Sequence, residues 1–198
     1  MPVHVNGFLS TLNEIELSRS WSYNLGWDQR IGRRSFIRTT AFWRDREIPH
    51  ADTNPLGMPQ PQLFEGDLYG AGVVWNQFVH RQVTLVTAYN FTQDEDLFSF
   101  RKNHEGSVSL YYINPRGVFF TASENFFKQN GVLGVPLPET KVFTTDLSVS
   151  YQFPERRGLV SFRISNLFDR RYQFLVDPLA LNQRIPKRQY EVSLSFNF

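Results

Sequence analysis

Apolar and polar residues alternate with a period of two along most of this chain. The pattern is clearest at the C-terminus, where polar residues separate five apolar ones. These are Tyr190, Val192, Leu194, Phe196 and Phe198. Successive side chains of a β-strand point to opposite faces, so this pattern predicts a strand with one apolar and one polar face.

The same alternation recurs upstream and predicts further strands. It covers residues 21–27, 83–91, 108–112, 143–153 and 160–164. Three more stretches, residues 35–44, 68–78 and 118–127, have strand-like composition, but their apolar phase is ambiguous. We therefore expect about nine strands and an all-β fold.

The predicted connections alternate between short and long. Short turns are expected at residues 30–34, 80–82, 114–117 and 154–158, and long links at 45–66, 93–106, 128–141 and 169–187. Proline cannot donate to a ladder, and we expect ten prolines to lie outside the strands: Pro49, Pro55, Pro59, Pro61, Pro115, Pro136, Pro138, Pro154, Pro178 and Pro186. An up-and-down antiparallel sheet would then carry tight turns at one end and long loops at the other.

Composition narrows the class of protein. The 198 residues suit a single domain, and the absence of cysteine excludes disulfides and cysteine-ligated metals. A formal net charge of +2 gives no support for nucleic acid as a partner, and we expect none. No apolar run is long enough for a transmembrane helix.

The polar positions suggest which face meets water. They are mostly Ser, Thr, Asn, Gln and Gly rather than Lys and Glu, which suits a crowded lumen better than an open aqueous surface. Aromatic residues gather near strand ends, as in the girdles of membrane barrels. The pattern favours an antiparallel up-and-down transmembrane β-barrel segment whose apolar face meets lipid. A soluble β-barrel that binds an apolar ligand stays open as an alternative.

Four segments of the chain carry more specific motifs. The C-terminal Tyr-x-Val-x-Leu-x-Phe-x-Phe segment, residues 190–198, resembles the signal recognised by the barrel-assembly machinery. Residues 160–172 contain the motif residues Asn166, Leu167, Phe168, Asp169 and Tyr172. This stretch is similar to the penultimate strand of the TonB-dependent outer-membrane receptors, a family of 22-stranded β-barrels. Residues 16–26 and the Ala41-Phe42-Trp43 segment resemble earlier strands of the family in the family's order.

The resemblance implies a role in uptake of a scarce ligand at the bacterial outer membrane. The ligand would be a ferric siderophore, cobalamin or a glycan, and the protein would not be an enzyme. Residues 1–18 would be an extracellular loop or the start of a fragment, and residues 19–198 the C-terminal barrel strands. The partners implied are outer-membrane lipid, the assembly machinery, and TonB only through an absent plug region.

The chain also departs from the family pattern. The plug domain, the TonB box and the first dozen or so strands have no counterpart here. About nine strands cannot close an antiparallel barrel, so we expect a partial barrel that belongs to a larger receptor. Other accounts are a closed barrel of eight or ten strands, a chain that oligomerises, or a small structural or adhesive outer-membrane barrel.

Candidate site residues are few. Asp28, Asp146, Arg163 and Glu191 fall at predicted lumenal positions, where charges need partners or water and can also contact a plug or substrate. We read Asp94, Asp96 and His104 as solvated loop charges rather than a rim active site, and His50 and His104 as unrelated to haem. No catalytic, metal or cofactor site is expected.

Overall fold

The structure is a computed structural model of the chain. It describes residues 19–53, 59–95, 99–133, 135–171, 173–174, 183–184 and 187–196, and the expectation for residues 1–18 lies outside them. Nine strands form one antiparallel sheet in sequence order, as predicted. They are β1 (Arg19–Ile31), β2 (Ser35–Thr53), β3 (Pro59–His80), β4 (Val83–Glu95), β5 (Ser99–Ile113), β6 (Val118–Leu133), β7 (Val135–Gln152), β8 (Gly158–Ser165) and β11 (Gln189–Phe196). Two short strands, β9 (Gln173–Phe174) and β10 (Gln183–Arg184), pair separately.

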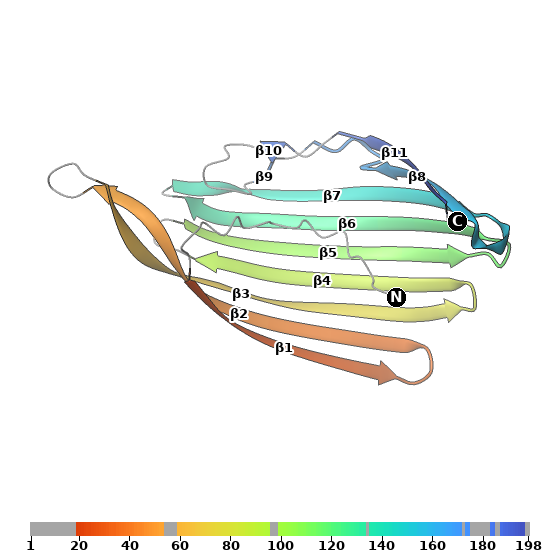
Figure 1. Cartoon of the computed structure of the whole chain (residues 1–198), viewed down its shortest axis with the longest axis horizontal. Helices are drawn as coiled ribbons and strands as arrows, with labels where there is room; N and C mark the ends of the chain where they lie inside the picture. The colour runs from red at the N-terminus through yellow and green to blue at the C-terminus, as the bar shows by residue number, and fades with distance from the viewer. Residues whose placement is uncertain are drawn as a thin grey trace.

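All four tight turns lie at one end of the sheet, which we call the turn end (Figure 1). The last of them contains a short 3-10 helix, η1 (Pro154–Arg156). Gly32 and Gly117 adopt positive φ angles of 64° and 88°, which favour glycine. Asn114 supports the third turn, because its side-chain oxygen accepts a hydrogen bond from the Arg116 amide at 2.9 Å. The opposite end is called the loop end.

The strands reach much further toward the loop end than predicted. The expected long links at 45–66, 93–106 and 128–141 are mostly strand, and only residues 54–58, 96–98 and 134 separate the paired strands. The link at 169–187 lies largely outside the described residues. Five prolines expected outside the strands are inside them: Pro49, Pro59, Pro61, Pro136 and Pro138.

Within the described residues, these prolines lie where a strand has a neighbour on one side only. β1 pairs with β2 as far as Glu47, and β4 pairs with β3 as far as Asp67, so residues 48–53 and 59–64 form a two-stranded arm (Figure 1). On β7, pairing with β8 begins only at Leu147. A missing amide donor is tolerated at such an edge or at a bulge, so proline did not exclude a strand there.

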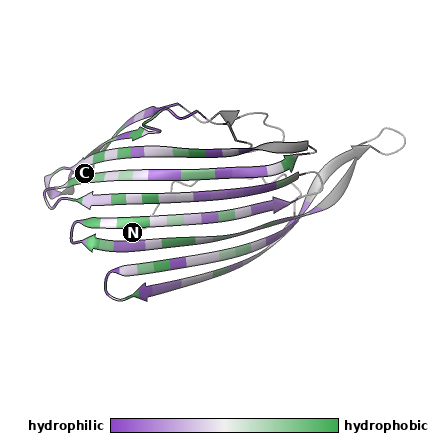
Figure 2. Ribbon diagram, turned by 180° about the vertical axis from the view of Figure 1, so that it is seen from behind, coloured by the Kyte–Doolittle hydropathy of each residue, from purple (hydrophilic) through white to green (hydrophobic). Residues whose placement is uncertain are grey.

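Within the described strands, the register puts the predicted apolar positions on one face. Directly paired residues of neighbouring strands share a face, and one continuous row of pairs joins β11 to β1. That row is Tyr190, Ile164, Leu147, Ala122, Leu110, Leu85, Gln77, Ser35 and Ile31. We call this side the apolar face and the other the polar face; Figure 2 shows the alternation along the strands.

The apolar band crosses the strands obliquely. The band begins at Tyr190 on β11 and at Trp21 on β1. The row of paired residues through Tyr190, however, reaches β1 at Ile31, which is ten residues beyond Trp21. Across the eight steps of the nine-stranded sheet this drift is roughly 1.25 residues per strand. With about 3.3 Å per residue and about 4.8 Å between strands, it corresponds to a tilt of about 40°. Strands of outer-membrane barrels tilt by a similar angle.

The described part of the chain has almost no buried apolar core. Its buried hydrophobic residues are Val86, Ala88, Phe127 and Val142, and the register puts all four on the polar face. Large side chains of the apolar face are exposed instead, including Trp21 at 66% and Val149 at 45%. A soluble barrel would bury such residues in its interior, so this arrangement favours lipid as their solvent. Among the described residues, no helix is long and apolar enough to cross a membrane.

Candidate functional site

The polar face carries the four charges predicted to be lumenal. Asp28, Asp146, Arg163 and Glu191 all fall on this face by register. Serine, threonine, asparagine and glycine fill most positions around them, although Phe42 and Phe127 also point to this side. The polar face is therefore the candidate functional surface.

Asp28 has a partner on the neighbouring strand. Nε and Nη2 of Arg38 on β2 donate to its two carboxylate oxygens at 2.7 and 2.9 Å. This two-pronged geometry fixes both side chains better than a single contact does. Both side chains are well over half exposed, however, so the pair contributes little to stability.

Asp146 joins β7 to the end of β8. Its Oδ2 pairs with Nη2 of Arg163 at 3.2 Å, and its Oδ1 accepts the backbone amide of Asn166 at 2.9 Å. Glu191 lies directly opposite Arg163 on β11. Three of the four predicted charges thus lie on three neighbouring strands, whereas Asp28 lies at the other edge of the sheet.

The motif residues form a compact turn at the end of β8. Asn166 and Asp169 adopt positive φ angles of 52° and 51°. The Asn166 side chain donates to the carbonyl of Arg170 and accepts its amide, both at 2.9 Å. Asparagine suits this position because its short polar side chain tolerates the left-handed region and bonds locally.

This turn also fastens its neighbours on both sides. The Leu167 amide donates to the Thr145 carbonyl of β7 at 2.8 Å, and the Asp169 carboxylate accepts the Arg188 amide at 2.9 Å, next to the start of β11. The segment therefore links β7, β8 and β11. Phe168 is exposed, and Tyr172 lies outside the described residues.

A buried ionic cluster near the loop end was not predicted. Asp94 on β4 pairs with Arg46 on β2 and, at 2.8 Å, with Nη2 of Arg101 on β5. All three side chains are only 10–12% exposed, so the reading of Asp94 as a solvated loop charge is wrong. The residue opposite Arg46 on the intervening β3 is Gly66, whose lack of a side chain leaves room for the guanidinium to cross. Only the strand order could reveal the whole cluster, because Arg46 precedes Asp94 by 48 residues and lies on a strand that is not a direct neighbour of β4.

The possible rim active site is not assembled among the described residues. Asp94 faces the polar side, whereas the register puts His104 on the apolar side. There His104 contacts the Tyr89 hydroxyl at 2.7 Å, and its ring centre lies 5.2 Å from that of Phe91. Asp96 and the side chain of His50 lie outside the described residues. No group of three metal-ligating side chains occurs in the part described.

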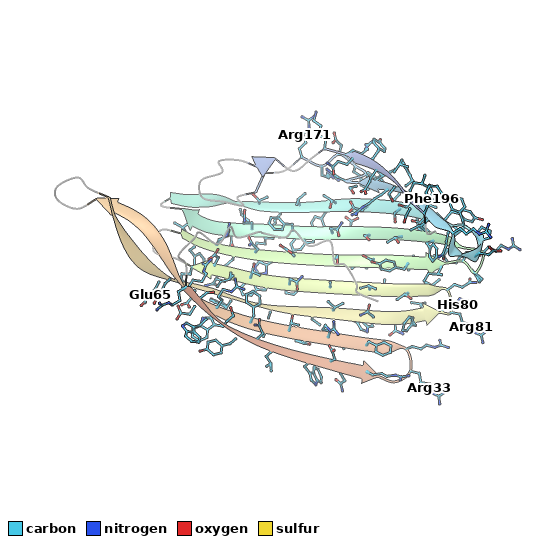
Figure 3. The ribbon with its side chains drawn as sticks, in the orientation of Figure 1. Arg33, Glu65, His80, Arg81, Arg171 and Phe196 are labelled. Carbon is cyan, nitrogen blue, oxygen red and sulfur yellow. The ribbon has the colours of Figure 1, made fainter. Side chains whose placement is uncertain are left out.

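The predicted assembly signal occupies the last described strand. Tyr190, Val192, Leu194 and Phe196 project from β11 on the apolar face, each 56–72% exposed. Figure 3 shows Phe196 toward the turn end, where Arg33, His80 and Arg81 also lie. Phe198 lies outside the described residues.

A comparison with solved structures connects this fold to the outer membrane. The chain is similar to OmpT, an outer membrane protein of Vibrio cholerae solved in vitro folded as a trimer, with a TM-score of 0.63 and 10% identity. The match covers 89% of this chain and 56% of the OmpT chain. No family model matches the sequence, and no curated protein matches it. The fold is thus that of an outer-membrane β-barrel.

This comparison also corrects one expectation from the sequence. The expectation that the protein is not an enzyme is withdrawn, because the similarity to OmpT gives a fold that does not exclude an enzymatic activity. At 10% identity the similarity shows a shared fold, and a fold hosts many activities. The TonB-dependent receptor assignment receives no family match.

Proposed function

We propose that this chain is the C-terminal barrel portion of a TonB-dependent outer-membrane receptor that takes up a scarce ligand, such as a ferric siderophore, cobalamin or a glycan. The turn formed by Asn166–Asp169 carries the proposal. The motif residues that resemble the family form a hydrogen-bonded junction among β7, β8 and β11, instead of an irregular loop. Asn166 is buried and its polar atoms are hydrogen-bonded, so the motif has a structural role where the three strands meet.

The length of the strands supports a receptor. A tilted strand crosses the apolar part of a bilayer in about 9–11 residues, whereas β3 has 22 and β2 has 19. The excess lies at the loop end, where the arm extends beyond the other strands (Figure 1). In the proposed orientation this end is extracellular, and the wall of long strands contributes to capturing a ligand.

The two open edges favour completion by further strands. β1 and β11 each pair on one side only within the described sheet, and unpaired backbone groups are costly in lipid. Both strands run from the loop end to the turn end, so a second copy in the same orientation would add a parallel seam. An odd number of additional strands closes the barrel with antiparallel pairs throughout.

A small structural or adhesive outer-membrane barrel is the second candidate. The similarity to OmpT favours it as much as it favours a receptor, because the match shows the barrel fold alone. The projecting arm would then serve adhesion instead of ligand capture. Both candidates share the lipid-facing apolar face and insertion by the assembly machinery.

The experiment that separates the candidates begins with the coding sequence upstream of Met1. An in-frame plug-encoding region would support the receptor. Cells producing the resulting full-length protein should then take up labelled ferric siderophore or cobalamin, and uptake should stop when TonB is deleted. A closed barrel without a plug, or uptake unaffected by TonB, would favour the second candidate.

A further inference from the structure

Lysine and arginine are distributed differently in this chain. Its four lysines are Lys102, Lys128, Lys141 and Lys187. The first three lie on the neighbouring strands β5, β6 and β7, all on the apolar face. In contrast, the register puts Arg38, Arg44, Arg46, Arg101 and Arg163 on the polar face. We call Lys102, Lys128 and Lys141 the lysine patch.

The lysine patch lies just beyond the aromatic margin of the apolar band. Phe126 and Phe143 pair across β6 and β7 with ring centres 4.9 Å apart. Lys128 and Lys141 pair in the next row, two residues further toward the loop end. Two residues of strand span about 7 Å, so the ammonium groups lie at headgroup depth if the rings mark the lipid interface.

A carboxylate already holds two of these ammonium groups together. Nζ of Lys128 lies 3.0 Å from one oxygen of Glu139, and Nζ of Lys141 lies 2.5 Å from the other. Hydrogen bonds from Lys141 and Lys128 lower the pKa of Glu139, which lies beyond the band. Both ammonium groups therefore converge on one small anionic group, which is a geometry that also suits phosphate.

Charges elsewhere at this height limit where an anion can bind. On the same face, β2, β3 and β4 carry the carboxylates Asp45, Glu47, Glu65, Asp67 and Glu95, and β1 carries one opposing cation, Arg19, opposite Glu47. These carboxylates repel anions, whereas Lys102, Lys128, Lys141 and Glu139 together carry a net positive charge. An anion that approaches the barrel from the lipid side is therefore directed to β5, β6 and β7.

We propose that the lysine patch binds the phosphate of a phosphorylated lipid headgroup in the leaflet at the loop end. This inference rests on the proposed membrane barrel but not on the transported ligand. Lipid is favoured over free phosphate because the patch borders the apolar band, where acyl chains can cover the aromatic margin while the phosphate contacts the lysines. Basic side chains next to a membrane each contribute to holding an anionic headgroup.

The test uses the assembled outer-membrane protein purified in mild detergent. It is titrated with bisphosphorylated lipid A, with its dephosphorylated form and with inorganic phosphate, and bound lipid is counted by native mass spectrometry. The double variant Lys128→Gln/Lys141→Gln should bind lipid A about tenfold more weakly. Lys187→Gln, which removes one positive charge that does not belong to the lysine patch, should bind like the wild type.

A third variant tests the competition at the patch. Glu139→Gln removes the competing carboxylate and should strengthen binding of lipid A, and heat-modifiable gel mobility confirms that each variant forms a barrel. Equal binding by the double variant and the Lys187 control overturns the proposal. So does lipid A binding that ignores dephosphorylation, or binding of inorganic phosphate that matches that of lipid A. If the wild-type protein binds lipid A but shows no TonB-dependent uptake, that result contradicts the proposed receptor function and leaves the lipid proposal standing.

Discussion

Asn166 illustrates how one residue decides local structure in this sheet. Its backbone is left-handed, its side chain forms two hydrogen bonds with the backbone of Arg170, and its backbone amide donates to the Asp146 carboxylate. Only 5% of the residue is exposed, so water cannot replace lost hydrogen bonds easily. The resemblance identified the residue, but its partner Asp146 is 20 positions away and follows only from the pairing of β7 with β8.

Replacing Asn166 should separate its two contributions. Asn166→Gly keeps the backbone conformation and loses two side-chain hydrogen bonds, which should cost about 1–3 kcal/mol of unfolding free energy. Asn166→Ala adds left-handed strain of about 1–2 kcal/mol. Urea unfolding of the assembled barrel in lipid vesicles measures both. Equal stability of the two variants would show that the backbone conformation carries no strain.

The strands show how far the sequence alone could lead. Period-two alternation predicted the number and order of the strands, and the facing of six of them, because lipid and lumen impose opposite polarity on alternate side chains. The apolar phase of residues 35–44, 68–78 and 118–127 was ambiguous, so the facing of β2, β3 and β6 came only from the register. Their loop-end limits were not predicted, because outside the band neither face must be apolar, and edge pairing accommodates prolines such as Pro49 and Pro61. The polarity of Asp28 and Asp146 predicted their face but not their partners, which depend on register.

Close packing on β3 gives a test at this scale. A Cβ at Gly70 would lie 2.5 Å from the carbonyl oxygen of Phe91 and 2.7 Å from the ring of Phe42. Gly70→Ala should therefore force backbone movement and destabilise the barrel by about 1–3 kcal/mol. Gly106→Ala is the control, because its Cβ would meet no atom closer than 3.7 Å. Similar melting temperatures for both variants would contradict the strand packing described for β3.

The whole molecule is organised by its solvent on each face. Its large apolar side chains are exposed on a single layer, and the described residues include no fully buried large side chain. Stability must then come from the hydrogen-bonded ladder and from the lipid around it. This predicts unequal tolerance of charge on the two faces of one strand.

Arginine substitutions on β7 test that prediction. Leu147→Arg places a charge on the apolar face between Ala122 and Ile164 and should cost about 2–4 kcal/mol in a bilayer. Ser150→Arg, on the polar face of the same strand, should cost much less. Folding into vesicles across a urea series gives both values. The opposite order of costs would make the apolar face the interior one.

The C-terminal aromatic residue should affect assembly more than stability. If the ring of Phe198 faces lipid as its assignment to the assembly signal implies, its removal should cost about 1.5–3 kcal/mol. A large barrel tolerates such a loss, so a severe defect would arise during insertion. Phe198→Ala in the full-length protein should reduce the amount in the outer membrane while each inserted molecule binds ligand normally. Membrane fractionation with ligand-binding assays measures this, and normal insertion with lost binding would contradict the assignment.

Because the apolar band crosses the strands obliquely, insertion into the bilayer selects the correct register of each strand pair. A slip of one residue in β2 would turn Arg38 and Arg44 toward the hydrocarbon, and each would cost up to about 2–4 kcal/mol near the midplane. A slip of two residues keeps the faces but moves the aromatic margin of one strand out of line with that of its neighbours. Mispaired hairpins would therefore fail to insert at the membrane surface before the barrel closes. This selection requires no dedicated recognition residue, because the cost of burying charge in lipid is sufficient.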